Sequence, residues 1–248
     1  MIFDKKFNLE KLNRIESYKK KSLIKKVSKI IDLFTENSVS YNYEFLGIPI
    51  IQYPEDMIVM QELIFNLKPD LIIEIGVARG GGLAFYSLLQ NFINKSYKVL
   101  GIDLDIRDHT KKAIKNHKLK NILTIEGSSI DPLVFKKVND IAKNFKKVMV
   151  ILDSKHTHDH VLKELNLYSS LVKRNSYIVV CDTTPHFVSK KTLGFIKRNY
   201  KFYLSKKSNA NTAVEEFISK NKNYIIDEDI NNKLLITNLR NGFLKRVK

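Results

Sequence analysis

The 248-residue sequence contains no tryptophan and only one cysteine, Cys181. A single cysteine excludes a disulfide within the chain and suits a reducing compartment, so we expect a cytoplasmic protein. No uninterrupted apolar run approaches the roughly 18 residues that a membrane-spanning helix needs. The opening residues also lack the apolar core and small-residue cleavage site of an export signal. These absences predict a globular protein without a membrane span.

Acidic residues are few, with 26 against 43 lysines and arginines, which leaves a net charge of +17. Such an excess can mark a nucleic-acid or anionic-membrane partner. Here the lysines are spread along the whole chain, and aromatic residues are not interleaved with the basic runs as a nucleic-acid stacking surface requires. We therefore interpret the charge as a bias of composition and predict no specific nucleic-acid partner.

Glycine is scarce as well, yet four of the nine glycines lie between residues 76 and 82. They end the stretch LIIEIGVARGGG (Leu71–Gly82), where an apolar run predicts a buried strand and the glycines predict a tight turn before a helix. In open α/β folds ligands bind at such a turn, because glycine lets them approach the backbone and the next helix offers free N–H groups. The spacing E-x-G-x-x-x-G differs from the dinucleotide motif G-x-G-x-x-G and is more similar to the first motif of S-adenosylmethionine (SAM) methyltransferases.

Strands and helices alternate through the middle of the chain. We expect strands at residues 71–76, 97–103, 121–126, 147–152 and 176–181, and helices at 82–93, 109–116, 131–144, 157–173 and 190–199. This alternation predicts a parallel sheet with helices on both faces. Near the end, residues 223–227 and 233–238 are close enough in sequence to form an antiparallel hairpin.

The lysine-rich segment 5–37 has apolar residues at helical spacing and predicts an N-terminal helical region with one buried stripe. The stripe could cover the chain's own core or a partner subunit, so the sequence leaves a homo-oligomer open. We divide the chain into an N-terminal helical extension at residues 1–55 and a Rossmann-like domain at residues 56–248. The predicted fold class is α/β, with the mostly parallel seven-stranded sheet and antiparallel C-terminal edge of SAM methyltransferases.

Function in such folds gathers at the carboxyl ends of the strands. Asp103 and Asp105 follow the second predicted strand in the segment GIDLD. An acid at this position is placed to accept hydrogen bonds from the ribose hydroxyls of a bound nucleoside. We assign this role to Asp103 rather than to Asp105.

Asp153 and Asp182 end two strands that should be neighbours. Two carboxylates there repel each other unless a cation or a proton lies between them, and their oxygens suit Mg²⁺ or another hard divalent ion. His156 should lie in the loop at the mouth of the sheet, where a neutral imidazole can accept a proton from a substrate hydroxyl. His158 and His160 fall in the first turn of the following helix, where we expect structural roles.

With these residues in view, the sequence resembles the cephalosporin hydroxylase family, also known as rhamnosyl O-methyltransferases, whose fold is that of SAM-dependent methyltransferases. Segments that carry the resemblance keep one order between residues 41 and 246. They are FLGIPIIQYPEDM (Phe45–Met57), PDLIIEIGVARGGG (Pro69–Gly82), KVLGIDLDIR (Lys98–Arg107), ILDSKHTHDHVLKEL (Ile151–Leu165), SYIVVCDT (Ser176–Thr183), NTAVEEFI (Asn211–Ile218) and LLITNLRNGFLKR (Leu234–Arg246).

The resemblance implies a set of site residues. Cofactor contacts are implied at Glu74, Gly76, Arg79, Gly80, Gly81 and Asp103, with Ser128 following the third strand. A divalent-metal position is implied at Asp153 and Asp182, with His156 as the candidate base beside Asp153. The sequence departs from the family at Cys181, where many relatives carry an acid, and at Ser128, which also replaces an acid.

These features predict a SAM-dependent O-methyltransferase that methylates a hydroxyl of a sugar, a glycan or a related small molecule, with Mg²⁺ as the candidate second cofactor. We expect the N-terminal helix and residues 184–212 to shape the acceptor pocket. Two alternatives stay open. Cys181 and Ser128 are compatible with a SAM-fold binding or assembly subunit without catalysis. The family's hydroxylase label would instead require an iron site built from Asp153 and two histidines.

Overall fold

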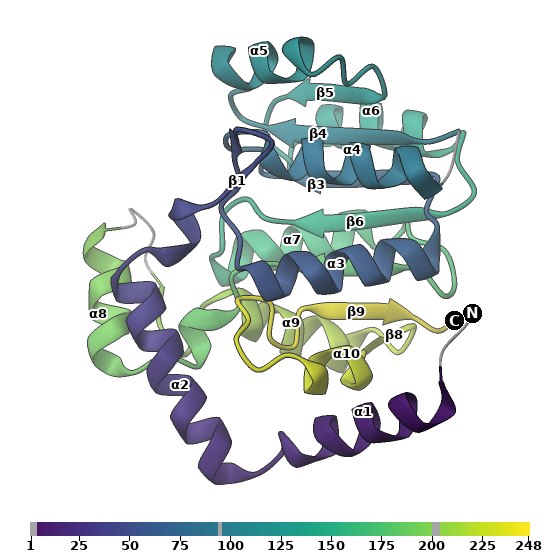
Figure 1. Cartoon of the computed structure of the whole chain (residues 1–248). Coiled ribbons are helices and arrows are strands. Elements are labelled where there is room, and N and C mark those ends of the chain that lie inside the picture. Colours follow the sequence, from purple (N-terminus) through teal and green to yellow (C-terminus); the bar gives the residue numbers. More distant parts are fainter. Residues whose placement is uncertain (1–3, 94–95, 200–203) are drawn as a thin grey trace.

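The computed structural model describes residues 4–93, 96–199 and 204–248 (Figure 1). A seven-stranded sheet forms its centre. The strands are β3 (Leu71–Ile75), β4 (Lys98–Asp103), β5 (Ile122–Glu126), β6 (Val148–Leu152), β7 (Tyr177–Val180), β8 (Tyr224–Ile226) and β9 (Phe243–Arg246). Their order is β5-β4-β3-β6-β7-β9-β8. The pairs from β5 to β7 are parallel, whereas β9 runs antiparallel to both β7 and β8, which confirms the predicted fold class.

Helices cover both faces of the sheet (Figure 1). On one face lie α3 (Pro54–Leu67) and α4 (Gly81–Ile93), and on the other lie α6 (Pro132–Ala142), α7 (His158–Tyr168) and α9 (Ala210–Lys220). The chain also forms α5 (Asp108–Asn116) after β4 and α10 (Glu228–Lys233) between β8 and β9. Every residue of β3 and β6 is buried, as expected for parallel strands covered on two sides.

The N-terminal part of the chain runs around the sheet, from beside α10 at one edge to beside α4 (Figure 1). It comprises α1 (Lys5–Ser17), α2 (Lys21–Glu36), the 3-10 helix η1 (Val39–Asn42) and the hairpin β1 (Glu44–Phe45) and β2 (Ile48–Pro49). After β7, η2 (Thr184–His186) leads to α8 (Lys190–Asn199). Val27 and Ile31 of α2 pack against Leu193 and Ile196 of α8, whereas α1 buries no residue. The predicted buried stripe therefore exists on α2 alone.

The predicted strand bounds of the parallel sheet agree with the structure to within one residue. The predicted hairpin is wrong in its second strand. Residues 223–227 contain β8, but the chain then turns into α10, and β9 supplies the antiparallel partner. Residues 233–238 form no strand, because the hydroxyl of Thr237 and the backbone N–H of Asn238 donate hydrogen bonds to Asp56 on α3. The pattern along the chain did not predict α9 either.

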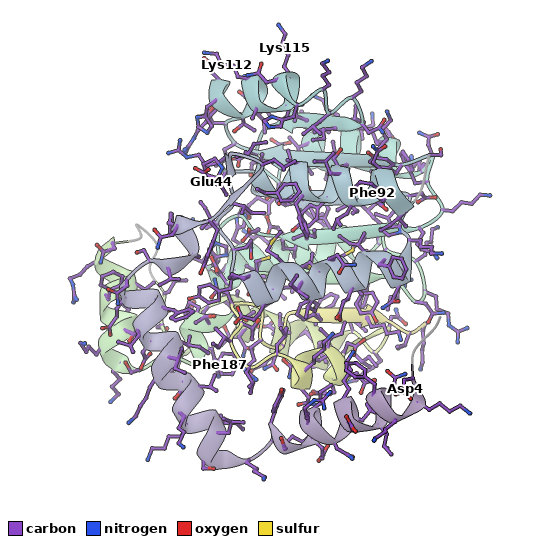
Figure 2. All side chains as sticks on the ribbon, viewed as in Figure 1. Asp4, Glu44, Phe92, Lys112, Lys115 and Phe187 are labelled. Atoms are coloured by element: carbon purple, nitrogen blue, oxygen red, sulfur yellow. The ribbon has the colours of Figure 1, made fainter. Side chains whose placement is uncertain are left out.

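Charged side chains such as Lys112 and Lys115 project outward from α5 (Figure 2). Within residues 4–93, 96–199 and 204–248, no helix combines the length and the apolar character that crossing a membrane requires.

The ends of β3 and β6 approach each other more closely than any side chain at residue 76 would allow. The backbone N–H of Asp153 donates to the carbonyl oxygen of Ile75 at 2.7 Å. Gly76 has a φ of +92°, and a Cβ there would lie 2.1 Å from the backbone oxygen of Asp153. Glycine is therefore required for both its conformation and its size.

We expect Gly76→Ala to destabilise the protein by about 3 kcal/mol, because left-handed strain adds to overpacking. Gly47→Ala is the matched control, since Gly47 also has a positive φ (+75°) but a Cβ added there would meet no described atom within 4 Å. That variant should lose only about 1 kcal/mol from backbone strain. Urea denaturation of both variants measures the difference, and equal losses would show that the contact with Asp153 is unimportant.

The buried carboxylate of Asp56 holds the C-terminal segment against α3. Its oxygens accept hydrogen bonds from the Thr237 hydroxyl and, at 2.8 Å, from the Asn238 backbone N–H. Burial raises the pKa of Asp56 to about 7. The folded state therefore binds a proton that the unfolded state, with an aspartate pKa of about 3.9, releases.

This difference predicts that folding stability falls as the pH rises between about 4 and 7, because ionised Asp56 costs more in the fold than in the unfolded chain. Asp56→Asn removes the titration. The stability advantage of the wild type over Asp56→Asn should therefore shrink by about 2 kcal/mol between pH 5 and pH 7. Urea denaturation at the two pH values measures it, and a pH-independent difference would contradict the prediction.

Candidate active site

The turn after β3 is held by a side chain from the end of β4. Asp103 Oδ2 accepts hydrogen bonds from the backbone N–H groups of Val77 (2.8 Å) and Ala78 (3.2 Å). Asp105 is exposed and forms a 3.8 Å ion pair with Arg107. Asp103 therefore lies in the glycine turn, whereas Asp105 lies outside it.

Glu74 lies beneath the first turn of α4. A Cβ at Gly82 would be 2.0 Å from Glu74 Oε1, so glycine allows the helix to start directly over the carboxylate. Glu74 is 5% exposed, and within the described part of the chain its Oε2 has no hydrogen-bond partner. Burial, followed by the charges of Asp153 and Asp103, raises the pKa of Glu74 well above its usual value. Because a buried acceptor without a donor is costly, this atom suits a donor carried by a ligand.

Asp153 and Asp182 follow the neighbouring strands β6 and β7, as expected. With His156 they form a cluster in which one ligand atom from each residue lies within 4.8 Å of the others. His156 Nε2 is 2.9 Å from Asp182 Oδ2. The structure thus brings together all three residues that we singled out for metal binding and proton transfer.

Two side chains that the sequence did not assign to the site, Gln52 and Asn238, contact these acids. Gln52 Nε2 donates to Asp153 Oδ2 at 2.9 Å, and the Asn238 side-chain amide donates to Asp182 Oδ1. The thiol of Cys181 also forms a hydrogen bond with Asp153. Gln52 and Asn238 both lie in segments that carry the family resemblance, and this was the signal that could have identified them.

The pKa values of the three cluster residues are shifted from their usual values. Burial, followed by the charge of Asp182, raises the pKa of Asp153 to about 8. Burial alone would lower the pKa of His156, but the carboxylates of Asp182 and Asp153 raise it to about 9. Burial alone would raise the pKa of Asp182, but the His156 imidazolium holds it below its usual value. At neutral pH the protein alone therefore keeps protons on His156 and Asp153.

The donor set fits a divalent cation. Two carboxylates and an imidazole converge within the reach of one ion, and oxygen ligands of this kind suit Mg²⁺. Cys181 is buried, and burial raises the pKa of its thiol well above the usual value. Sulfur is a poor ligand for a hard cation such as Mg²⁺, so Cys181 contacts Asp153 as a neighbour and does not replace the missing acid in coordination.

The other predicted cofactor residues lie in the turn after β3 and in the loop after β5. Gly80 has a φ of +88° in the turn, and Gly81 begins α4 against the backbone of Pro49. Arg79 is exposed in the same turn, while Ser128 is half-buried in the loop after β5. Arg79 and Ser128 are therefore not among the buried polar residues, and their contact with the cofactor stays a prediction.

His158 and His160 each contact residues outside the cluster. His158 lies 2.9 Å from the Thr212 hydroxyl and 3.1 Å from Glu216, both on α9. His160 lies 3.1 Å from Glu164 on its own helix. Neither belongs to the cluster around Asp153, so the two-histidine iron site of the hydroxylase alternative is not assembled.

Known proteins resemble this chain in sequence. A model of the family described as "Rhamnosyl O-methyltransferase/CmcI" matches residues 37–247. The rhamnosyl O-methyltransferase of Mycobacterium tuberculosis is 30% identical over 140 residues, which are 56% of this chain and 56% of that protein. The Mycobacterium leprae enzyme of the same name is 31% identical over 140 residues, or 56% of this chain and 59% of its own. The chain thus spans little more than half the length of these curated relatives.

Solved structures show the same fold. A CmcI structure described with Mg and SAM has a TM-score of 0.60 at 20% identity, covering 84% of this chain and 78% of its own. An apo structure of CmcI has a TM-score of 0.61 at 20% identity, covering 84% of this chain and 77% of its own. Because the family model matches most of the sequence, from residue 37 to residue 247, the chain belongs to the rhamnosyl O-methyltransferase/CmcI family.

Proposed function

We propose that the protein is a SAM-dependent O-methyltransferase that methylates a hydroxyl of a sugar, a glycan or a related small molecule. Membership of the family and the name of the mycobacterial relatives support this activity. Within the chain, we propose that residues 56–248 form the catalytic domain and that residues 1–55 are an extension beside it.

The observation that carries the proposal is the concentration of acids around the glycine turn. Burial raises the pKa of Glu74, and the nearby acids Asp153 and Asp103 raise it further. A ligand with phosphate groups would bring more negative charge to acids that already resist ionisation, and its binding would be disfavoured. SAM instead carries an ammonium and a sulfonium group, and both positive charges are favoured there. The turn therefore suits SAM better than a dinucleotide.

Each residue then has a role that follows from its position. Asp103 offers oxygen acceptors to ribose hydroxyls, and Glu74 Oε2 offers one to an ammonium group. Gly76 and Gly80 leave the turn free of side chains, so that a ligand can lie against the backbone. SAM supplies a methyl group that its sulfonium already activates, and the protein mainly aligns the acceptor and excludes water.

His156 is the proposed base for the acceptor hydroxyl. Its imidazole lies between Asp182 and Asp153, which orient the ring and stabilise the imidazolium that proton transfer forms. Positive charge brought into the site lowers the pKa of His156 and so frees the ring to accept a proton. Asp153 and Asp182 would hold Mg²⁺, which supplies anchoring of neighbouring hydroxyls and lowers their pKa.

Substitution of Asp103 tests the cofactor site. Asp103→Ala removes the proposed ribose acceptor and the support of the turn, so the Kd for SAM should rise at least tenfold. The control is Asp105→Ala, whose side chain lies outside the turn and should leave the Kd within about twofold. Isothermal titration calorimetry measures both. If the wild type binds no SAM, or if Asp103→Ala binds it as tightly as the wild type, the proposal is wrong.

Substitution of His156 tests the chemical step. His156→Ala should lower kcat for methyl transfer by about 10²–10⁴-fold while leaving SAM affinity nearly unchanged. His158→Ala is the control, because His158 contacts α9 and should affect stability more than kcat. Transfer of a labelled methyl group from SAM to bacterial glycan and lipid extracts provides the assay. Equal losses of kcat in the two variants would show that His156 is not the base.

A further inference from the structure

A pocket opens beside the acid cluster and contains two of its members. It has a volume of about 150 Å³, and His156, Asp182 and Asn238 form one side of it. The opposite side comes from segments outside the parallel sheet: the end of α2, η1 and the linker between β2 and α3, together with η2, α8 and Leu204. The pocket therefore lies between the proposed base and the N-terminal part of the chain.

The wall of this pocket combines large apolar side chains with the hydroxyl-bearing residues Thr35, Ser38, Ser40 and Thr184. Its large side chains are Phe34, Tyr41, Ile51, Tyr53, Ile196 and Leu204. Phe34 and Tyr53 meet edge to face, with 5.7 Å between their ring centroids, and Tyr53 is only 3% exposed. These two rings therefore form a packed back wall whose position is set by the fold.

Charge is nearly absent from the lining. Among the residues that the structure describes, the pocket contains no lysine or arginine, although the chain has 43 of them. Its charged groups are His156 and Asp182, which belong to the acid cluster. The His156 imidazolium is already paired with Asp182 at 2.9 Å. A carboxylate or phosphate on the bound ring would therefore meet Asp182 without a further cationic side chain in the lining to pair with, and the lining favours an uncharged ring.

Tyr41 differs from the other aromatic residues of the wall. It lies on η1 shortly after Ser38, whose φ of +51° turns the chain at the end of α2. Tyr41 is 50% exposed and yet lines the pocket, so its ring borders both the pocket and the solvent. A ring so placed can cover the apolar face of a sugar that enters from solution, by dispersion and by burial of C–H groups.

We propose that this pocket binds the reacting ring of the acceptor as an uncharged sugar, and that Tyr41 is a specificity-determining residue that packs on that ring. The inference rests on the proposed function and adds to it the class of ring and the residue that selects it. The ring then lies against His156, with its hydroxyls toward the acids and an apolar face toward Tyr41.

Binding of simple glycosides tests this inference without the natural acceptor. The probes are methyl rhamnoside, methyl glucoside and methyl glucuronoside, the last two differing in one carboxylate. Their Kd values are measured by NMR titration of the SAM-loaded protein. We expect the two neutral glycosides to bind and the glucuronoside to bind at least tenfold more weakly. Tyr41→Ala should raise the Kd of the neutral glycosides roughly tenfold, whereas Tyr41→Phe should leave their Kd unchanged.

Phe92→Ala is the matched control, because Phe92 is an 89% exposed ring at the far end of α4 (Figure 2). It should leave every Kd unchanged. SAM binding, measured by calorimetry on each variant, separates the two proposals and reports folding. If the wild type binds SAM but no neutral glycoside, or if Tyr41→Ala binds the glycosides as the wild type does, the pocket assignment is wrong and the proposed function stands. Failure of the wild type to bind SAM would instead refute the proposed function.

Discussion

The contact between the ends of β3 and β6 is the constraint on which the rest of the site depends. The Asp153 backbone donates to Ile75, and Gly76 lies against the Asp153 carbonyl with no space for a side chain. This contact brings the glycine turn of one strand next to the acid of the other. The proposed cofactor turn and the proposed metal-binding acid therefore lie side by side at the same edge of the sheet.

The ionisation of the acids at this junction determines which ligands it favours. Glu74 and Asp153 are buried acids with raised pKa values, and Asp182 stays ionised only because His156 lies 2.9 Å away. Such a group of acids destabilises the protein when no ligand is bound, and a positive charge bound beside the acids reduces this destabilisation. We therefore expect the proposed site to favour a cationic ligand through an unfavourable feature of the fold itself. Asn238 and Gln52 limit this cost by donating hydrogen bonds.

Some features of this fold depend on residues close together in the sequence, and others depend on residues far apart. Only the first kind could be predicted from the sequence. The parallel strands and the acids at their ends were predictable, because apolar runs and the residues that follow them are local signals. The second strand of the hairpin was misplaced because a single buried acid, Asp56, holds Thr237 and Asn238 from 181 and 182 residues away. Gln52 and Tyr41 lie in irregular segments without periodicity, and their neighbours are defined only by tertiary structure.

The linker between β2 and α3 has a consequence for how this family could diversify. Ile51 and Tyr53 line the pocket, while Gln52 between them donates to Asp153. Successive residues of one short linker thus serve two neighbouring compartments. Phe34 joins the α2 side of the pocket wall to this linker through its ring contact with Tyr53, and any insertion or deletion within residues 51–53 would exchange the side chains between compartments. We therefore expect the proposed acceptor range to change through the other wall residues of α2 and η1, while this linker keeps its length.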